Sequence, residues 1–361
     1  MLPIITLSLT LLASSLVLAY ETTLGFNSAA VIETRTLDEI YQAALAEGGT
    51  VTLWHGGDET NQQDTMKQAF ESRFPGMMLN LTVDLSKYHN GKLDQQLAAN
   101  NVHVDSVILQ TLHDYPRWTQ EGALLHYAPK GFDQIHPAFR DTTAAWYGVY
   151  VFGWSFVWNM DKINVSLAEF ADVLRPELKN KLVLTYPNDD DAVLYAFDLI
   201  LGQYGNGWLD ALLAQNPRWV RGTATPASIL SQENTIWAAT FTSITGLSPP
   251  HPLKATYPTG PFVTWPQTAA IPKDAPHPEG AKLLHNWILS EEFQGPRGWS
   301  VRQDVPDPEG FPLPSLMKMP GTNPTDFARW MADRAKVDRL RLWFESKLGT
   351  AQGSSPLVDD L

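Results

Sequence analysis

The first third of the chain repeats one pattern of apolar and polar residues: a short apolar run, a polar turn, then apolar residues three or four apart. Residues 50–75 show this order most clearly. The apolar run at 51–54 favours a β-strand, and the turn His55-Gly56-Gly57-Asp58 interrupts it. We expect Asp58 to cap the helix that follows and Pro75 to end it. That helix is predicted because one face would collect Met66, Ala69, Phe70 and Phe74.

The same reasoning extends along the chain. Strands alternating with helices predict an α/β fold containing parallel sheet. Ligands of such sheets bind beyond the carboxyl ends of the strands, where the 55–58 turn is expected to lie. Further strands are predicted at 78–83, 104–109, 182–184, 236–244 and 269–272. Further helices are predicted at 37–47, 88–100, 115–121, 189–200, 207–215, 227–232, 278–289, 291–294 and 326–348.

Two segments are expected to cross between lobes. Residues 146–158 are aromatic, β-prone and twice interrupted by glycine, which indicates a long strand or a strand pair. Residues 247–266 are rich in proline and are predicted to be irregular, forming the return crossover. The predicted fold is therefore two lobes, each a mixed, mostly parallel sheet flanked by helices, with a ligand cleft between them. The expected division is a signal peptide (1–19), a flexible lead (20–36), the first lobe (37–147), the second lobe (148–256), the return to the first lobe (257–300), and a C-terminal loop and helix packing on the lobes (301–361).

Composition excludes several kinds of partner and site. The 361 residues carry a formal net charge of −13, which disfavours nucleic acid and other polyanionic partners. The sequence has no cysteine, which excludes disulfides, a cysteine nucleophile and thiolate metal sites. No cofactor is expected, and a monomer is predicted.

The N-terminal residues indicate export. Residues 1–19 are uncharged and apolar, and Val17 and Ala19 match the small-residue cleavage pattern before Tyr20. We expect a secreted, extracellular protein (periplasmic if bacterial), with no stable membrane insertion after cleavage. Asn80 and Asn164 each begin a possible glycosylation sequon, which favours a eukaryotic source.

Three polar turns are candidate ligand contacts. Glycines in His55-Gly56-Gly57-Asp58 would let backbone N–H groups approach a ligand, although Asp58 as a cap and His55 as a structural residue explain them equally well. Asp189-Asp190-Asp191 suits a helix start, and three carboxylates also suit a cation, a hydroxylated ligand or a hard metal. A third turn offers Gly222, Thr223 and Thr225, with Thr225 expected to cap a helix that starts at Pro226. In the aromatic crossover, Tyr150 and Trp154 could stack on a flat or cationic ligand.

Several stretches resemble one protein family. Residues 37–44, 47–54 and 69–76 are similar to the start of extracellular solute-binding proteins. Residues 271–294, which include the run Pro276-His277-Pro278-Glu279-Gly280-Ala281-Lys282, resemble a characteristic segment of type II periplasmic binding proteins, in the ferric-iron and thiamine-type branch of ABC substrate-binding proteins. The resemblance implies two lobes joined by two crossovers that close over one small ligand, and a permease partner if the source is bacterial. Ferric members commonly use an adjacent Tyr-Tyr pair. This sequence has none, and the nearest candidate is Tyr195.

The predicted function is capture of a small organic molecule, a metal ion or a metal chelate by hinge closure, without chemistry on the ligand. No Gly-x-Ser-x-Gly, His-Glu-x-x-His or P-loop pattern occurs. Two alternatives stay open. One is a secreted, glycosidase-like hydrolase that uses Asp190 and a distant glutamate. The other is a protein-interaction module whose cleft is vestigial.

Overall fold

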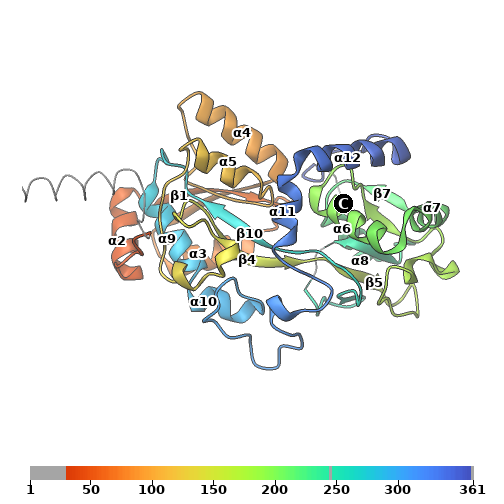
Figure 1. Ribbon diagram of the computed structural model, residues 1–361. Coiled ribbons are helices and arrows are strands. Elements are labelled where there is room, and N and C mark those ends of the chain that lie inside the picture. Colours follow the sequence, from red (N-terminus) through yellow and green to blue (C-terminus); the bar gives the residue numbers. More distant parts are fainter. Residues whose placement is uncertain (1–29, 244–245, 359–361) are drawn as a thin grey trace, which may run out of the picture.

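Two α/β lobes lie side by side, joined by extended strands (Figure 1). This computed structural model describes residues 30–243 and 246–358. The predicted signal peptide and most of the predicted lead lie outside those residues. Among the described residues, no helix has both the length and the apolar character needed to cross a bilayer.

The first lobe is built on a five-stranded sheet in the order β2-β1-β3-β10-β4. Strand β1 pairs in parallel with β2 and β3, whereas β10 is antiparallel to β3 and β4. The burial of β1 alternates along the strand, as expected for a sheet covered unequally on its two faces. The strands are β1 (Thr50–Gly56), β2 (Met78–Asp84), β3 (Ser106–Leu109), β4 (Tyr147–Gly153) and β10 (Thr264–Ala270).

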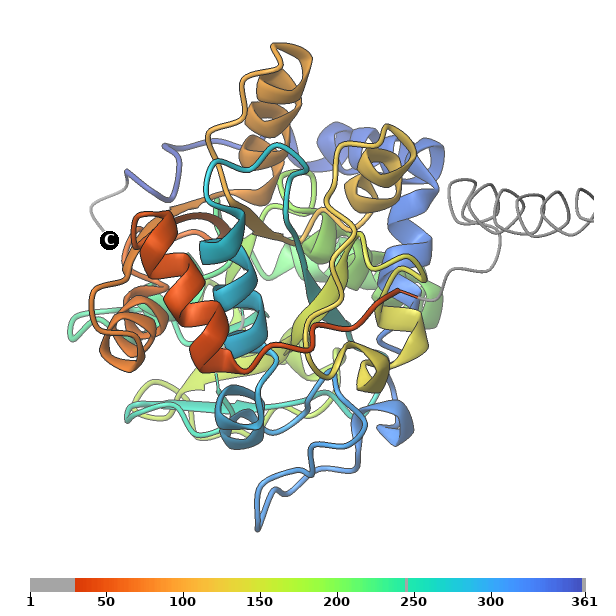
Figure 2. The same ribbon diagram turned by 90° about the vertical axis from the view of Figure 1, so that its left-hand side faces the viewer.

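Helices cover both faces of this sheet. Figure 2 shows α2 beside α9, and these two helices pack together. Their apolar faces, with those of α3 and α10, form a core that contains Ile40, Phe70, Leu284 and Trp287. A smaller core under α4 and α5 contains Leu93 and Trp118. The helices are α2 (Leu37–Glu47), α3 (Asp64–Arg73), α4 (Ser86–Ala98), α5 (Asp114–Gln120), α9 (Pro278–Ile288) and α10 (Glu291–Gln294).

The second lobe contains two smaller sheets. Strand β5 pairs antiparallel with β8 and β9, and β6 pairs in parallel with β7. Parallel and antiparallel pairing therefore both occur, as predicted, but parallel pairing does not predominate. The strands are β5 (Ser155–Asn159), β6 (Val183–Thr185), β7 (Arg218–Val220), β8 (Ala239–Ser243) and β9 (Leu253–Thr256), and the helices are α6 (Asp191–Tyr204), α7 (Asn206–Ala214) and α8 (Thr225–Ser231).

The aromatic segment crosses between the lobes as a strand pair. Strand β4 belongs to the first sheet, β5 belongs to the second lobe, and Trp154 alone separates them. The chain returns between β9 and β10. The proline-rich segment was expected to be irregular, and that expectation is wrong in part. Residues 253–256 form β9, and β10 already begins at Thr264. Strand β10 can contain Pro266 because its pairing with β4 is irregular nearby, between Gln267 and Thr268.

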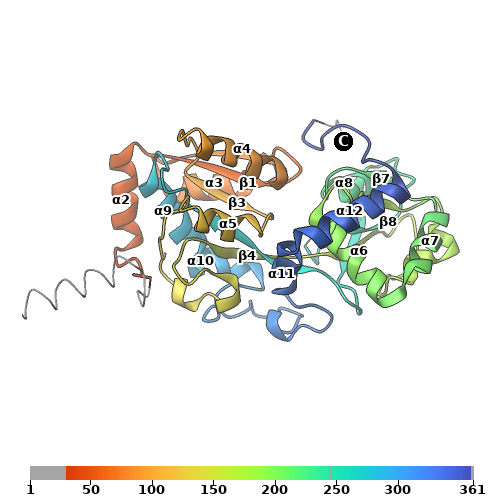
Figure 3. The same ribbon diagram turned by 45° about the horizontal axis from the view of Figure 1, so that its top comes forward.

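The C-terminal helices pack on the second lobe (Figure 3). The single helix predicted at 326–348 is wrong, because the structure divides it into α11 (Asp326–Ala332) and α12 (Arg334–Leu348). Asp333 separates them with φ −82° and ψ 71°, and its side chain accepts a hydrogen bond from Lys336 N, which starts α12. The break lets both helices bury aromatic residues, including Phe327, Trp330 and Phe344. Six short 3₁₀ helices complete the described elements: Phe132–Gln134, Pro137–Phe139, Asp172–Leu174, Pro176–Leu178, Gly295–Arg297 and Leu316–Lys318.

Two predicted helix caps are wrong. Asp58 does not cap α3, which begins at Asp64 and follows Gln63, a residue without a side-chain cap. Thr225 is the first residue of α8 rather than its cap, and Ala224 precedes it. In both cases the polar turn has another role, because its groups face the opposite lobe.

Candidate functional site

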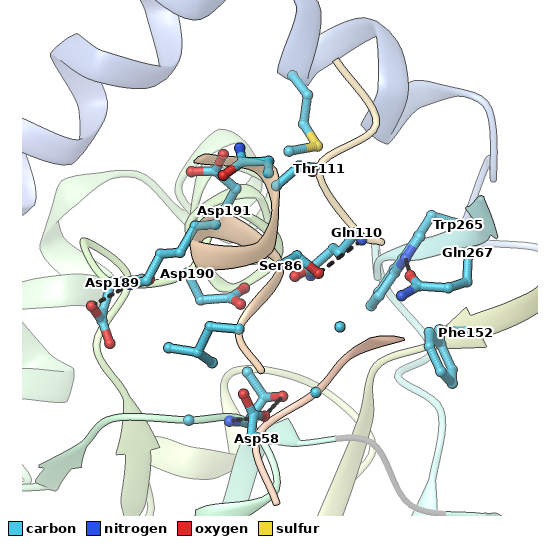
Figure 4. A pocket seen from close by; sticks show the side chains of 18 of the residues that line it. Asp58, Ser86, Gln110, Thr111, Phe152, Asp189, Asp190, Asp191, Trp265 and Gln267 are labelled. Atoms are coloured by element: carbon cyan, nitrogen blue, oxygen red, sulfur yellow. Dashed lines mark hydrogen bonds and ion pairs between the residues drawn. The ribbon is translucent and has the colours of Figure 1, made fainter. Parts of the chain in front are cut away.

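A cavity of about 400 Å³ lies between the two lobes (Figure 4). Pockets of this size hold small organic ligands. The first lobe supplies the turn after β1, the start of α4 and the residues after β3, all at the carboxyl ends of parallel strands. The second lobe supplies the start of α6 and the turn before α8, and the C-terminal helices supply Met331, Arg334 and Arg341.

The two glycines of the first turn are required by packing. A Cβ atom at Gly56 would lie 2.0 Å from Ser86 Oγ, and one at Gly57 would lie 2.5 Å from Gln62 Oε1. Gly56 therefore lets the end of β1 lie directly against the start of α4, and Gly57 leaves room for the side chains of Gln62 and Val83. Both line the cavity.

Asp58 links the lobes. Its Oδ2 atom accepts hydrogen bonds from Thr223 N at 2.6 Å, Thr223 Oγ1 at 2.5 Å and Ala224 N at 3.1 Å. Asp58 is only 5% exposed. The carboxylate thus satisfies backbone donors that lie 165 and 166 residues away along the chain, which holds the cleft closed at this point.

Two further contacts cross between the lobes. Lys87 Nζ donates to both Asp189 Oδ1 and the Asp189 carbonyl oxygen at 2.6 Å. Arg221 Nη2 donates to Tyr88 Oη at 2.9 Å, and its Nε donates to Asp189 Oδ2 at 2.9 Å. The start of α4 in the first lobe is therefore tied to two turns of the second lobe.

The three consecutive aspartates point to different partners. Asp190 caps α6, because its Oδ1 accepts from Ala192 N at 2.8 Å and Val193 N at 3.0 Å. Asp189 pairs with Lys87 and Arg221, whereas Asp191 pairs with Arg334 and Arg341 of α12. The cluster does not form a metal site, and no group of three potential ligands among histidine, cysteine, aspartate and glutamate occurs among residues 30–243 and 246–358.

These environments separate the aspartate pKa values. Burial raises the pKa of Asp189, but hydrogen bonds from Arg221 and the charge of Lys87 outweigh it and leave the pKa below its ordinary value. Burial raises the pKa of Asp190 to about 7, and the negative charges of Asp58 and Asp191 add to the effect. Asp190 is therefore the carboxyl of this cluster whose charge is least compensated.

One wall of the cavity is aromatic. It contains Phe152, Trp154 and Trp265, and the ring centroid of Trp265 lies 5.5 Å from that of Phe152 and 6.1 Å from that of Trp154. Trp154 thus lies where the sequence predicted an aromatic contact. Tyr150 does not line this cavity, because its ring stacks on His55 inside the first lobe.

Two other candidate residues also lie outside the cavity lining. His55 is fully buried, its Nε2 contacts Tyr150 Oη, and burial lowers its pKa to about 4, so it is neutral at physiological pH. Thr225 is 1% exposed and its Oγ1 has no hydrogen-bond partner in the structure. The candidates that do line the cavity are Gly56, Gly57, Asp58, Trp154, Asp189, Asp190, Asp191, Gly222 and Thr223.

Sequence reasoning missed several lining residues. Gln110 and Thr111 directly follow β3, so the rule applied to the 55–58 turn would have found them. No local signal indicated Gln267 or Arg334, because each reaches the cavity only through the path of the chain. The two sequon residues, Asn80 and Asn164, are exposed on the surface, and their glycosylation stays a prediction. Tyr195 packs against Phe327 and Trp330 rather than lining the cavity.

Comparison with solved structures shows a shared fold. The periplasmic binding protein AfuA from Actinobacillus pleuropneumoniae, with fructose-6-phosphate bound, has a TM-score of 0.65 at 18% identity, covering 84% of this chain and 100% of that one. A substrate-binding protein of an ABC transporter from Agrobacterium tumefaciens has a TM-score of 0.66 at 14% identity, covering 83% and 94%. Iron-bound HitA from Pseudomonas aeruginosa has a TM-score of 0.59 at 13% identity, covering 82% and 99%. The chain therefore has the two-lobed fold of type II periplasmic binding proteins, as predicted.

No family model matches the sequence, and no curated protein matches it.

Proposed function

We propose that this protein is a non-catalytic solute-binding protein that encloses a small organic ligand between its lobes. The observation that carries the proposal is the interlobe cavity, whose two walls are linked by Asp58 and Lys87. A ligand that contacts both walls would stabilise the closed state relative to the open one. Proteins of the same fold support this function, since HitA is known with iron bound and AfuA with fructose-6-phosphate bound.

The lining favours an organic ligand over a bare metal ion. Asp189 and Asp191 already have basic partners, and the described residues provide no cluster of three metal ligands. A hydrolytic role has less support, because none of the described glutamates lines the cavity and Asp58 is held by backbone donors of the other lobe. We place the protein outside the cytoplasm, as a monomer, and working with a permease if the source is bacterial.

Native mass spectrometry of the secreted, deglycosylated protein, purified without added ligand, tests this function. We expect an adduct of a few hundred daltons, and small-angle scattering should show the protein becoming less compact when the adduct is removed. An adduct of tens of daltons would instead indicate a metal ion. Turnover of a glycan would support the hydrolase. A cleft that stays empty and does not change shape would support the interaction module.

A further inference from the structure

Each lysine and arginine that lines the cavity already has a carboxylate partner. Lys87 pairs with Asp189, and both Arg334 and Arg341 pair with Asp191, at distances of 2.6 to 3.1 Å. Burial lowers the pKa of His113, the other basic lining residue, so this side chain is neutral near pH 7. An anionic ligand would have to compete with these carboxylates for the basic side chains.

Asp190 differs from its two neighbours. Both hydrogen bonds that it accepts end at Oδ1 and come from its own helix, so Oδ2 is left for the cavity. In Figure 4 its carboxylate points toward the middle of the cavity, and Phe152 and Trp265 lie on the far side. No described basic side chain forms an ion pair with Asp190 or with Asp58.

A second feature of the cavity also favours a ligand with polar groups. Thr111 is 6% exposed and lines the cavity, yet its Oγ1 has no hydrogen-bond partner in the structure. Gln267, which is 2% exposed, accepts from Trp265 Nε1 at 3.0 Å through Oε1, and Figure 4 shows its amide nitrogen directed into the cavity. A buried polar atom without a partner is costly, so Thr111 Oγ1 is suited to a polar atom of a ligand, and the Gln267 amide nitrogen can donate to another.

We propose that the cleft selects an organic solute that carries an ammonium group, with Asp190 as its counter-ion and the aromatic wall packing over its cationic end. This proposal rests on the function proposed above and names the ligand class. An ammonium group near Asp190 replaces the missing positive charge, and the faces of tryptophan and phenylalanine attract cations. The raised pKa of Asp190 agrees with a buried carboxyl that has no ion-pair partner, since the charge of Lys87 offsets the effect of burial only in part.

Three probes of similar size test the charge preference. Phenethylamine, 2-phenylethanol and 3-phenylpropanoate carry a positive, a neutral and a negative group on comparable aromatic skeletons. Their affinities for the full mature protein are measured at millimolar concentrations by ligand-observed NMR. We expect phenethylamine to bind at least about tenfold more tightly than the other two, which corresponds to about 1.4 kcal/mol.

The matched variants are Asp190→Asn and Asp210→Asn. Asparagine is a good helix cap, so Asp190→Asn keeps the start of α6 while removing the charge. Asp210 is exposed on α7 and does not line the cavity, so its variant removes an equal charge elsewhere. We expect Asp190→Asn to abolish the preference for the amine and Asp210→Asn to retain it.

Four outcomes would overturn the proposal: no detectable binding of the amine, equal binding of the three probes, an amine preference that survives in Asp190→Asn, or displacement of the amine by stoichiometric calcium. Tighter binding of the alcohol or the carboxylate would overturn the ligand class while leaving the solute-binding function intact. The solute-binding function itself fails only if the purified protein also carries no adduct and its cleft does not close.

Discussion

Replacing Asp58 with alanine should open the cleft. Asp58→Ala removes the acceptor of three hydrogen bonds between the lobes, from Thr223 N, Thr223 Oγ1 and Ala224 N. Hydrogen bonds to a charged group contribute about 1.5 to 3 kcal/mol each. The three bonds share one oxygen and water replaces them in the open form, so we take roughly 3 kcal/mol for the set. That energy shifts the equilibrium between closed and open forms by about 100-fold.

The absence of cysteine makes the assay direct. Cysteines introduced at Ala99 and Ala214, both exposed and located in different lobes, can carry a pair of dyes without competing thiols. When both proteins are freed of ligand, single-molecule energy transfer should show a larger population at the closed distance in the parent than in Asp58→Ala. Asp64→Asn, which removes an exposed charge near the same turn, should behave like the parent. Identical distance distributions for the parent and Asp58→Ala would refute the role of Asp58 as an interlobe contact.

The remaining predictions concern stability. Phe344→Ala should lower the free energy of unfolding by about 3 to 5 kcal/mol in chemical denaturation, because Phe344 is fully buried between α12 and the second lobe, whereas Leu342→Ala at a 64% exposed site should have little effect. Gly56→Ala should lower the melting temperature, because the new Cβ atom would meet Ser86 Oγ, and adding Ser86→Gly should restore part of it. Melting temperature should fall as pH decreases from about 6.5 to 4: burial holds three histidine pKa values at about 3 to 4, so the unfolded chain binds more protons in that range. The three histidines are His55, His89 and His285. Asp190, whose pKa is raised to about 7, acts in the opposite direction but is a single group. A melting temperature that stays constant or rises as the pH falls would contradict this assignment.

The sequence by itself determined the order of elements and several local features. Periodicity reports which backbone segments can bury one face, so the strands and helices of the first lobe lie within a few residues of their predicted positions. The crossing at 146–158 was visible because a β-prone aromatic run interrupted by glycine suits a strand pair, and the structure has β4 and β5 there. One of the three aspartates at 189–191 caps α6, as expected of carboxylates at a helix start, and the structure identifies it as Asp190.

Only the tertiary structure decided which polar groups meet. Asp58 follows a strand and precedes a helix, so local rules made it a cap, whereas its partners are the backbone donors of a turn in the other lobe. Gln267 and Arg334 reach the cavity from the return strand and the C-terminal helix, and nothing in their immediate sequence indicates this. Local periodicity encodes burial and backbone hydrogen bonding, but hydrogen bonds and ion pairs between distant side chains depend on the path of the whole chain. The composition of the cavity therefore follows from the packing of the lobes.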